Sequence, residues 1–141
     1  MSDIMLSNEN MQYINMAVKI TKAAIIDCMI IDDKIIFVVD KGQIGLALGV
    51  KAKNLIKLKN MFKKNIRFIE YNSNKEIFIK NICKPYTLKK INFEGSDEEP
   101  IVKLEVETSD KSKIIGKGGK NIEIIRSLAK RHHSIKDVQI K

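Results

Sequence analysis

Residues 114–131 read IIGKGGKNIEIIRSLAKR, and the prediction of the fold starts from this segment. Two isoleucines lead into a turn made of glycines and one lysine. After the turn, apolar residues recur at the spacing of one helical face, at Ile122, Ile125, Leu128 and Ala129. The segment therefore predicts the end of one helix, a tight turn and the start of a second helix.

The turn, Gly116-Lys117-Gly118-Gly119, matches neither common nucleotide-binding loop. A Walker A loop ends in Gly-Lys-Ser/Thr and a dinucleotide-binding loop needs a third glycine, whereas Asn121 stands at the corresponding place here. Two interpretations stay open. Glycine can serve a plain connection between helices by supplying a positive φ. Alternatively, the turn clamps a nucleic-acid backbone, with phosphate favoured by the helix N-terminus and by Lys117 and Lys120.

An internal repeat extends the pattern over the chain. An offset of 67 residues aligns LGVKAKNLIKLKNMFKK (48–64) with IGKGGKNIEIIRSLAKR (115–131), and the apolar positions stay in phase throughout. Gly49 then falls on Gly116, and Asn54 falls on Asn121. We predict two copies of one module, residues 1–72 and 73–141, which we expect to pack against each other because neither has a large core.

Both copies show the same succession of local patterns. The first predicts a helix over 9–23, strands over 25–31 and 34–39, helices over 42–48 and 53–63, and a strand over 66–71. The second predicts a helix over 74–83, strands over 86–93 and 100–108, helices over 110–115 and 120–131, and a strand over 135–141. Three finer expectations follow: Met11 and Val18 face the core, Asn65 closes the helix before it, and Ser109 or Asp110 caps the helix at 110. The fold class is α+β.

The positive charge is concentrated in two blocks. The 141 residues include 26 Lys and Arg against 17 Asp and Glu, a net charge of +9. Residues 41–69 carry eight basic residues and no acid, and residues 109–141 carry nine basic residues and three acids. Each block contains one copy of the turn and its following helix. Such an excess attracts polyanions, although a solvated helix face is the alternative interpretation.

The order of elements, with Ile-Gly-x-x-Gly between paired helices, resembles a type II KH domain. Two in tandem resemble the archaeal NusA family of transcription elongation and termination factors, through GQIGLALGVKAKNLIKL (42–58) and KIIGKGGKNIEIIRSLAKR (113–131). The resemblance implies binding of single-stranded RNA and a part in transcription termination or antitermination. Contact with RNA polymerase or the elongation complex is left open, because no residues correspond to the polymerase-binding region of bacterial NusA.

The resemblance places the intact clamp at residues 116–119. In the first copy the clamp becomes Gly49-Val50-Lys51-Ala52, where the methyl of Ala52 and the bulk of Val50 put RNA binding in question. The expected RNA-binding residues are Gly116, Lys117, Gly118, Gly119, Lys120, Asn121, Gly49, Lys51, Lys53, Asn54 and Arg126. For Arg126, a solvated helix face is an equal alternative.

Other functional classes find less support. An enzyme is not expected, because no carboxylate cluster lies near either basic block. No metal or other cofactor is expected either: Cys28 and Cys83 form no ligand pattern, and we expect both to be buried, reduced thiols. No apolar run approaches the roughly 18 residues of a membrane span, and no secretory signal is visible, so we expect a cytoplasmic protein without a membrane partner. A ribosome- or exosome-associated KH module remains the alternative function.

Overall fold

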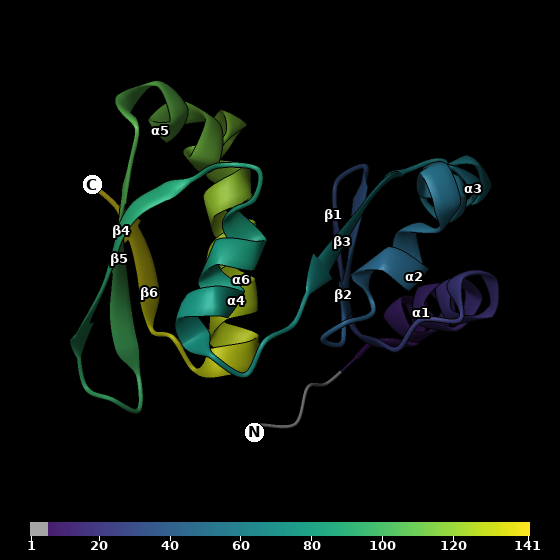
Figure 1. Ribbon diagram of the computed structural model, residues 1–141, viewed down its shortest axis with the longest axis horizontal. Helices are drawn as coiled ribbons and strands as arrows, with labels where there is room; N and C mark the ends of the chain where they lie inside the picture. Colours follow the sequence, from purple (N-terminus) through teal and green to yellow (C-terminus); the bar gives the residue numbers. More distant parts are fainter. Residues whose placement is uncertain (1–5) are drawn as a thin grey trace. The chain divides into compact units, whose positions relative to one another are not determined.

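The computed structural model describes residues 6–141, which divide between Asn72 and Ser73 into two compact units. We call residues 6–72 module 1 and residues 73–141 module 2 (Figure 1).

Module 1 has one sheet covered on one face by helices. Its elements are α1 (Asn8–Thr21), β1 (Ile25–Ile31), β2 (Lys34–Val39), α2 (Ile44–Leu48), the 3-10 turn η1 (Val50–Ala52), α3 (Lys53–Phe62) and β3 (Asn65–Glu70). β2 is the central strand, antiparallel to β1 and parallel to β3. Ile14, Ile35, Phe37 and Leu58 form the core between the sheet and the helices α1 and α3.

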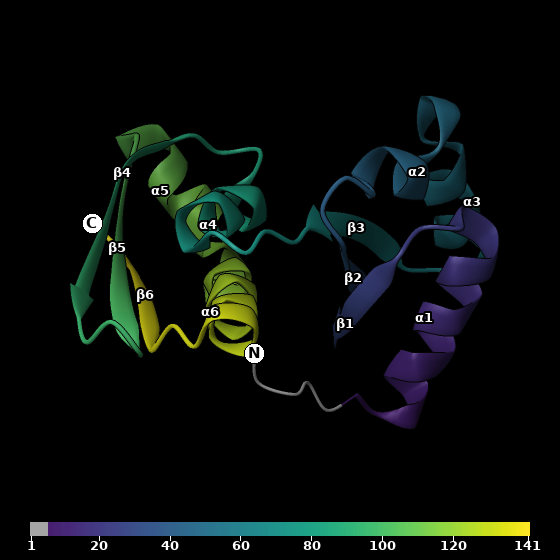
Figure 2. The ribbon, with the colours of Figure 1, turned by 60° about the horizontal axis from the view of Figure 1, so that its bottom comes forward.

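Module 2 repeats this arrangement. Its elements are α4 (Lys75–Cys83), β4 (Leu88–Gly95), β5 (Pro100–Val106), α5 (Thr108–Ile115), the 3-10 turn η2 (Lys117–Gly119), α6 (Lys120–His133) and β6 (Asp137–Ile140). β5 is central, antiparallel to β4 and parallel to β6. Figure 2 shows α4 and α6 lying along one face of this sheet.

The parallel strand pairs determine where the glycine turns lie. Parallel strands need a long crossover connection, and here each crossover consists of a short helix, the turn and a longer helix. The turns at η1 and η2 therefore occupy the same place in the two modules. The order helix, strand, strand, helix, helix, strand is confirmed in both, as expected of the type II KH fold.

The predicted inward face of α6 is confirmed, because Ile122, Ile125, Leu128 and Ala129 are all buried. In β5, Val102 and Leu104 are buried on the side that faces the helices. The opposite face carries charges: Lys103 Nζ lies 2.9 Å from Glu94 Oε2. This hydrogen bond to Lys103 lowers the pKa of the Glu94 carboxyl.

Three finer expectations are wrong. Met11 and Val18 are 40% and 37% exposed, because the face of α1 that packs on the sheet is formed by Ile14, Ala17 and Thr21, with Tyr13 and Ile20 partly buried beside them. Asn65 does not close α3: Lys63 ends the helix in the left-handed conformation, and Asn65 already pairs in β3. The N-cap of α5 is Glu107, with no side-chain capping bond. Cys28 and Cys83 are buried free thiols, as expected.

Candidate nucleic-acid interface

The two glycine turns have nearly the same backbone. Gly49 has φ 77° and ψ 171°, and Gly116 has φ 80° and ψ 167°. At the fourth position, Ala52 (φ 58°, ψ 28°) adopts the same left-handed conformation as Gly119 (φ 74°, ψ 13°). The alanine therefore leaves the shape of the first turn intact.

The first glycine of each turn is required by close packing. A Cβ on Gly116 would lie 2.8 Å from the Cβ of Asn121, and a Cβ on Gly49 would lie 2.9 Å from Nδ2 of Asn54. Each asparagine side chain then ties the second helix back to the first. Asn121 Nδ2 donates to the Ile114 carbonyl at 2.7 Å, and Asn54 Nδ2 donates to the Leu46 carbonyl at 3.1 Å.

The last two glycines of the second turn face open space instead. No atom lies within 4 Å of a Cβ built on Gly118, and the nearest atom to one on Gly119 is Ile122 Cγ2 at 3.9 Å. Steric room inside the protein does not demand glycine at either position. What their bare backbone provides is a surface that another molecule can approach closely.

Backbone donors are available on this surface. Within the part of the chain that the structure describes, the N–H groups of Lys117 and Gly118 donate to no protein acceptor. No side chain caps the N-terminus of α6. Unpaired N–H groups beside a helix N-terminus form a site that favours an anion such as phosphate.

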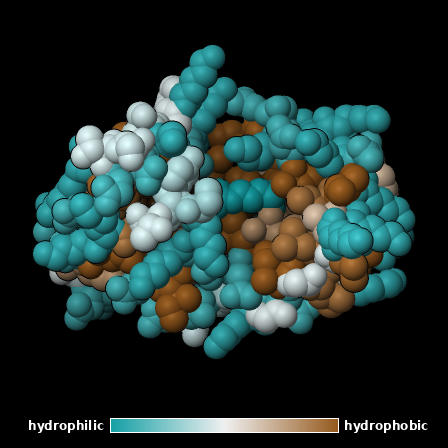
Figure 3. Space-filling model, turned by 45° about the horizontal axis from the view of Figure 1, so that its top comes forward, coloured by the Kyte–Doolittle hydropathy of each residue, from teal (hydrophilic) through white to brown (hydrophobic). Residues whose placement is uncertain are grey.

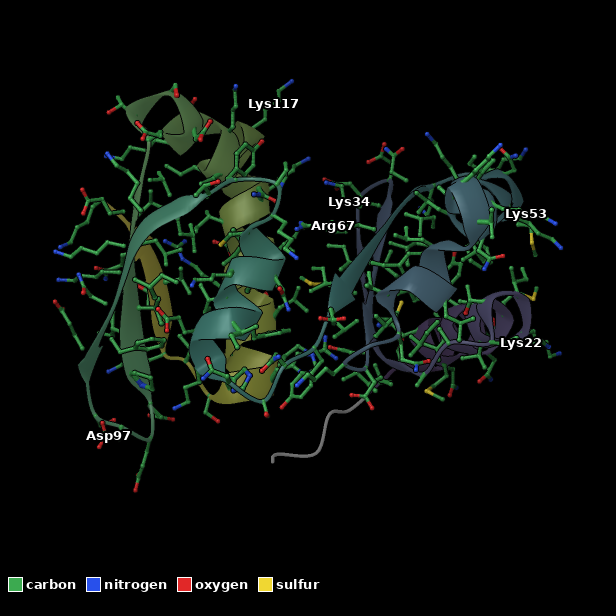
Figure 4. The ribbon with its side chains drawn as sticks, in the orientation of Figure 1. Lys22, Lys34, Lys53, Arg67, Asp97 and Lys117 are labelled. Atoms are coloured by element: carbon green, nitrogen blue, oxygen red, sulfur yellow. The ribbon has the colours of Figure 1, made fainter. Side chains whose placement is uncertain are left out.

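Lysines surround both turns. Lys117 projects outward from η2, and Lys53 lies at the start of α3 (Figure 4). Lys120 is the first residue of α6. A lysine at a helix N-terminus is disfavoured by the helix dipole, and a bound anion would offset this cost. Among the described residues, Lys51 and Lys53 take part in no ion pair.

The surface around the first turn is more apolar than that around the second. Val50 is 81% exposed at the place of Lys117, and Ile56 is 55% exposed at the place of Glu123. Hydrophobic surface is visible over module 1, on the right of Figure 3. The first turn thus keeps the backbone of the clamp, with Val50 in place of Lys117 and with its lysine, Lys51, at the third position.

Arg126 lies away from the turn and already has protein partners. Its Nε donates to the Val138 carbonyl at 3.0 Å and lies 3.1 Å from Asp137 Oδ1, while its Nη1 lies 3.4 Å from Glu123 Oε1. The guanidinium therefore connects α6 to β6. Sequence reasoning also missed the internal bonds of Asn54 and Asn121, since nothing in their spacing distinguishes a carbonyl partner from a ligand.

Two observations bear on other functional classes. Within residues 6–141, no group of three or more His, Cys, Asp or Glu side chains is placed to hold a metal ion. No helix in the same range is both long and apolar enough to cross a membrane.

Comparison with known proteins matches both modules. A model of the NusA-like second KH domain matches residues 75–140, and a KH domain model matches residues 12–85. A protein named "Probable transcription termination protein NusA" from Methanococcus vannielii is 34% identical over 137 residues, which are 97% of this chain and 79% of that protein. The chain belongs to the archaeal NusA family.

Two further similar proteins match along nearly their whole length. The Halobacterium salinarum protein with the same name is 31% identical over 97% of this chain and 98% of its own. The crystal structure of APE1850 superposes with a TM-score of 0.80 at 28% identity, covering 96% of this chain and 100% of that one. The family resemblance predicted from the two turns is confirmed.

Proposed function

We propose that this NusA-family protein binds single-stranded RNA, chiefly through the turn 116–119 of module 2, and acts in transcription termination. The observation that carries the proposal is the uncovered backbone of Gly118 and Gly119, with unpaired N–H groups and Lys117 beside it. The role in termination is supported by the names of the relatives.

In this proposal the turn holds the sugar-phosphate backbone and the adjoining surface contacts bases. A phosphate lies against the N–H groups of Lys117 and Gly118, and the ammonium groups of Lys117 and Lys120 add attraction. Such contacts release counterions, so affinity falls steeply as salt is raised. Single-stranded RNA fits better than a duplex because only unstacked bases expose their edges beside the turn.

The remaining site residues take different roles. Gly49, Lys51 and Lys53 form a second, weaker contact with RNA in module 1, because the clamp backbone is kept there while Val50 replaces the lysine. Asn54 and Asn121 hold the turns in shape through their bonds to Leu46 and Ile114, and they act on RNA only through that shape.

The test of RNA binding is Gly118→Asp in the full chain. The aspartate side chain collides with nothing, so the positive φ is its only structural cost, and its carboxylate repels phosphate. The matched control is Gly95→Asp, which also has a positive φ (83°) and no atom within 4 Å. We expect Gly118→Asp to weaken binding of an oligouridylate by at least about ten-fold, as judged from the charge reversal at a phosphate contact. Gly95→Asp should change it by less than about two-fold. If Gly118→Asp and Gly95→Asp both fold and bind the RNA with equal affinity, the proposed clamp at residues 116–119 is refuted.

The test of termination is a transcription reaction with purified archaeal RNA polymerase on a template with a terminator. The terminated fraction should change on adding the wild-type chain and not on adding Gly118→Asp. We propose that the protein contacts the elongation complex in the cytoplasm and has no catalytic step. Co-purification with ribosomal particles instead of polymerase would favour the alternative, and cleavage of labelled RNA with Mg²⁺ would contradict a pure binding role.

A further inference from the structure

A basic hollow lies on module 1 at the end of α3, away from the glycine turn. It has a volume of about 320 Å³ and is lined by Asp33, Lys59, Asn60, Lys63, Lys64 and Asn65. Two segments meet there: the end of α3 and the turn between β1 and β2. Lys34, which follows Asp33, and Lys53, at the start of α3, lie on opposite sides of module 1 in Figure 4.

Most of the charge in this hollow is unpaired. Among the described residues, Lys59 and Lys63 take part in no ion pair. Lys64 Nζ donates to the Asp32 carbonyl at 3.2 Å. This carbonyl carries no full charge and so does not neutralise the lysine. The single carboxylate, Asp33, accepts from Asn65 Nδ2 at 3.3 Å. Three ammonium groups therefore face one carboxylate.

The end of α3 by itself would disfavour an anion. The dipole places roughly half a negative charge at a helix C-terminus, which is less than the excess of lysine charge around the hollow. Lys63 is the left-handed C-cap, and its N–H donates to the Lys59 carbonyl at 2.9 Å. This bond fixes the backbone that carries both lysines.

Module 2 offers an internal comparison. The repeat places Arg126 at the position of Lys59, and Arg126 is bonded to Asp137 and Val138. Module 2 instead has a lysine in its turn, where module 1 has Val50. Module 1 keeps Lys51 and Lys53 at its turn and has additional cations, Lys59 and Lys63, at the far end of the helix.

A polar stripe connects the turn to the hollow. Lys53, Lys57 and Asn60 follow one another at helical spacing, and Asn60 lines the hollow. The ten residues of α3 span about 15 Å. A KH turn holds about four nucleotides, so an RNA strand a few nucleotides longer reaches the hollow.

We propose that the hollow formed by Lys59, Lys63, Lys64 and Asn60 is a second phosphate site, for an RNA strand held at the first turn. The inference rests on the proposed RNA-binding function. RNA is favoured over an acidic protein segment because the stripe that leads to the hollow is polar and starts at a turn with the clamp backbone.

The experiment uses a chain in which binding at the turn of module 2 is weakened by Gly118→Asp. In the full chain with Gly118→Asp, affinities for oligouridylates of four and twelve nucleotides are compared with and without Lys59→Gln and Lys63→Gln. The control is Lys90→Gln with Lys136→Gln, which removes the same charge from exposed residues of module 2.

We expect the Lys59/Lys63 double change to weaken binding of the longer RNA about ten-fold, and to reduce its salt slope by about 1.4, since each phosphate contact to a single strand contributes about 0.7. The Lys59/Lys63 double change should alter affinity for the shorter RNA by less than about two-fold. The Lys90/Lys136 control should alter affinity for the longer RNA by less than about two-fold. The proposed site would be overturned if the Lys59/Lys63 change weakened binding of both RNA lengths equally, or if the control weakened binding of the longer RNA as much. It would also be overturned if the chain with Gly118→Asp alone no longer bound the longer RNA. If wild-type protein binds neither RNA, the proposed function itself fails.

Discussion

The fourth position of each turn gives a direct test of whether glycine there serves the fold or a ligand. Module 1 has Ala52 and module 2 has Gly119 in nearly the same conformation. We predict the effects of exchanging them, by Gly119→Ala and by Ala52→Gly, in the full chain.

The magnitude follows from the structure. A Cβ on Gly119 meets only Ile122 Cγ2 at 3.9 Å, an ordinary contact, so no collision contributes. The left-handed conformation costs an alanine about 1–2 kcal/mol, and glycine loses about 0.4–1 kcal/mol more chain entropy on folding. Gly119→Ala should therefore destabilise module 2 by about 1 kcal/mol, and Ala52→Gly should stabilise module 1 by about the same amount.

Hydrogen exchange measures the stability of each module separately within one molecule. Amides of α6 should exchange about five-fold faster in Gly119→Ala, and amides of α3 about five-fold slower in Ala52→Gly, because 1.4 kcal/mol is a factor of ten in opening. In titrations with oligouridylate, Gly119→Ala should bind about three-fold or more weakly, since its methyl occupies the surface that the RNA backbone approaches.

Two results would refute this reasoning. A loss above about 3 kcal/mol in Gly119→Ala would mean that the methyl collides with something, contrary to the open space at this position. An unchanged RNA affinity, together with the expected loss of stability, would mean that Gly119 serves the turn alone.

Two further predictions concern residues with internal partners. Gly116→Ala should cost about 3 kcal/mol, because its Cβ would overlap Asn121 and break the bond to Ile114; a chemical denaturation midpoint no lower than that of Gly119→Ala would contradict this. Arg126→Lys should lower the melting temperature, because lysine cannot keep both the bond to Val138 and the contact with Asp137. RNA affinity, measured below the transition, should stay within about two-fold because the charge is kept and lies away from the turn; a loss like that of Gly118→Asp would place Arg126 on the RNA path.

Local patterns predicted most of the fold. The strands at 25–31 and 34–39 appear with the predicted bounds because two runs of mainly β-branched and apolar residues are separated by Asp32 and Asp33, which favour a turn. The inward face of α6 follows from its period. The α1 face was overestimated, since spacing shows which residues share a side of a helix and not how wide the packed stripe is.

The site was harder to predict where it depends on contacts between distant segments. The hollow at Lys59 and Lys63 exists because α3 ends beside Asp33, some thirty residues earlier, which is about the length of a strand–helix–strand crossover. The sequence shows a run of lysines there and gives no sign of concavity. An RNA track and a solvated helix face were equal interpretations of Arg126, and neither included its contacts with Asp137 and Val138, because these residues belong to another element.

The internal repeat separates the demands of the fold from those of a ligand. Gly49 and Gly116 are the same in both copies, and so are Asn54 and Asn121, and these are the positions where an added methyl would collide or a bond would be lost. The third and fourth positions differ between the copies, and there the protein leaves room for a side chain. Module 1 shows that the turn forms with lysine and alanine at those positions. Beyond the positive φ, which glycine adopts without strain, the fold does not require the glycines of module 2. Close approach of an external backbone is a second physical reason for them, and it predicts that module 2 is the stronger RNA-binding site.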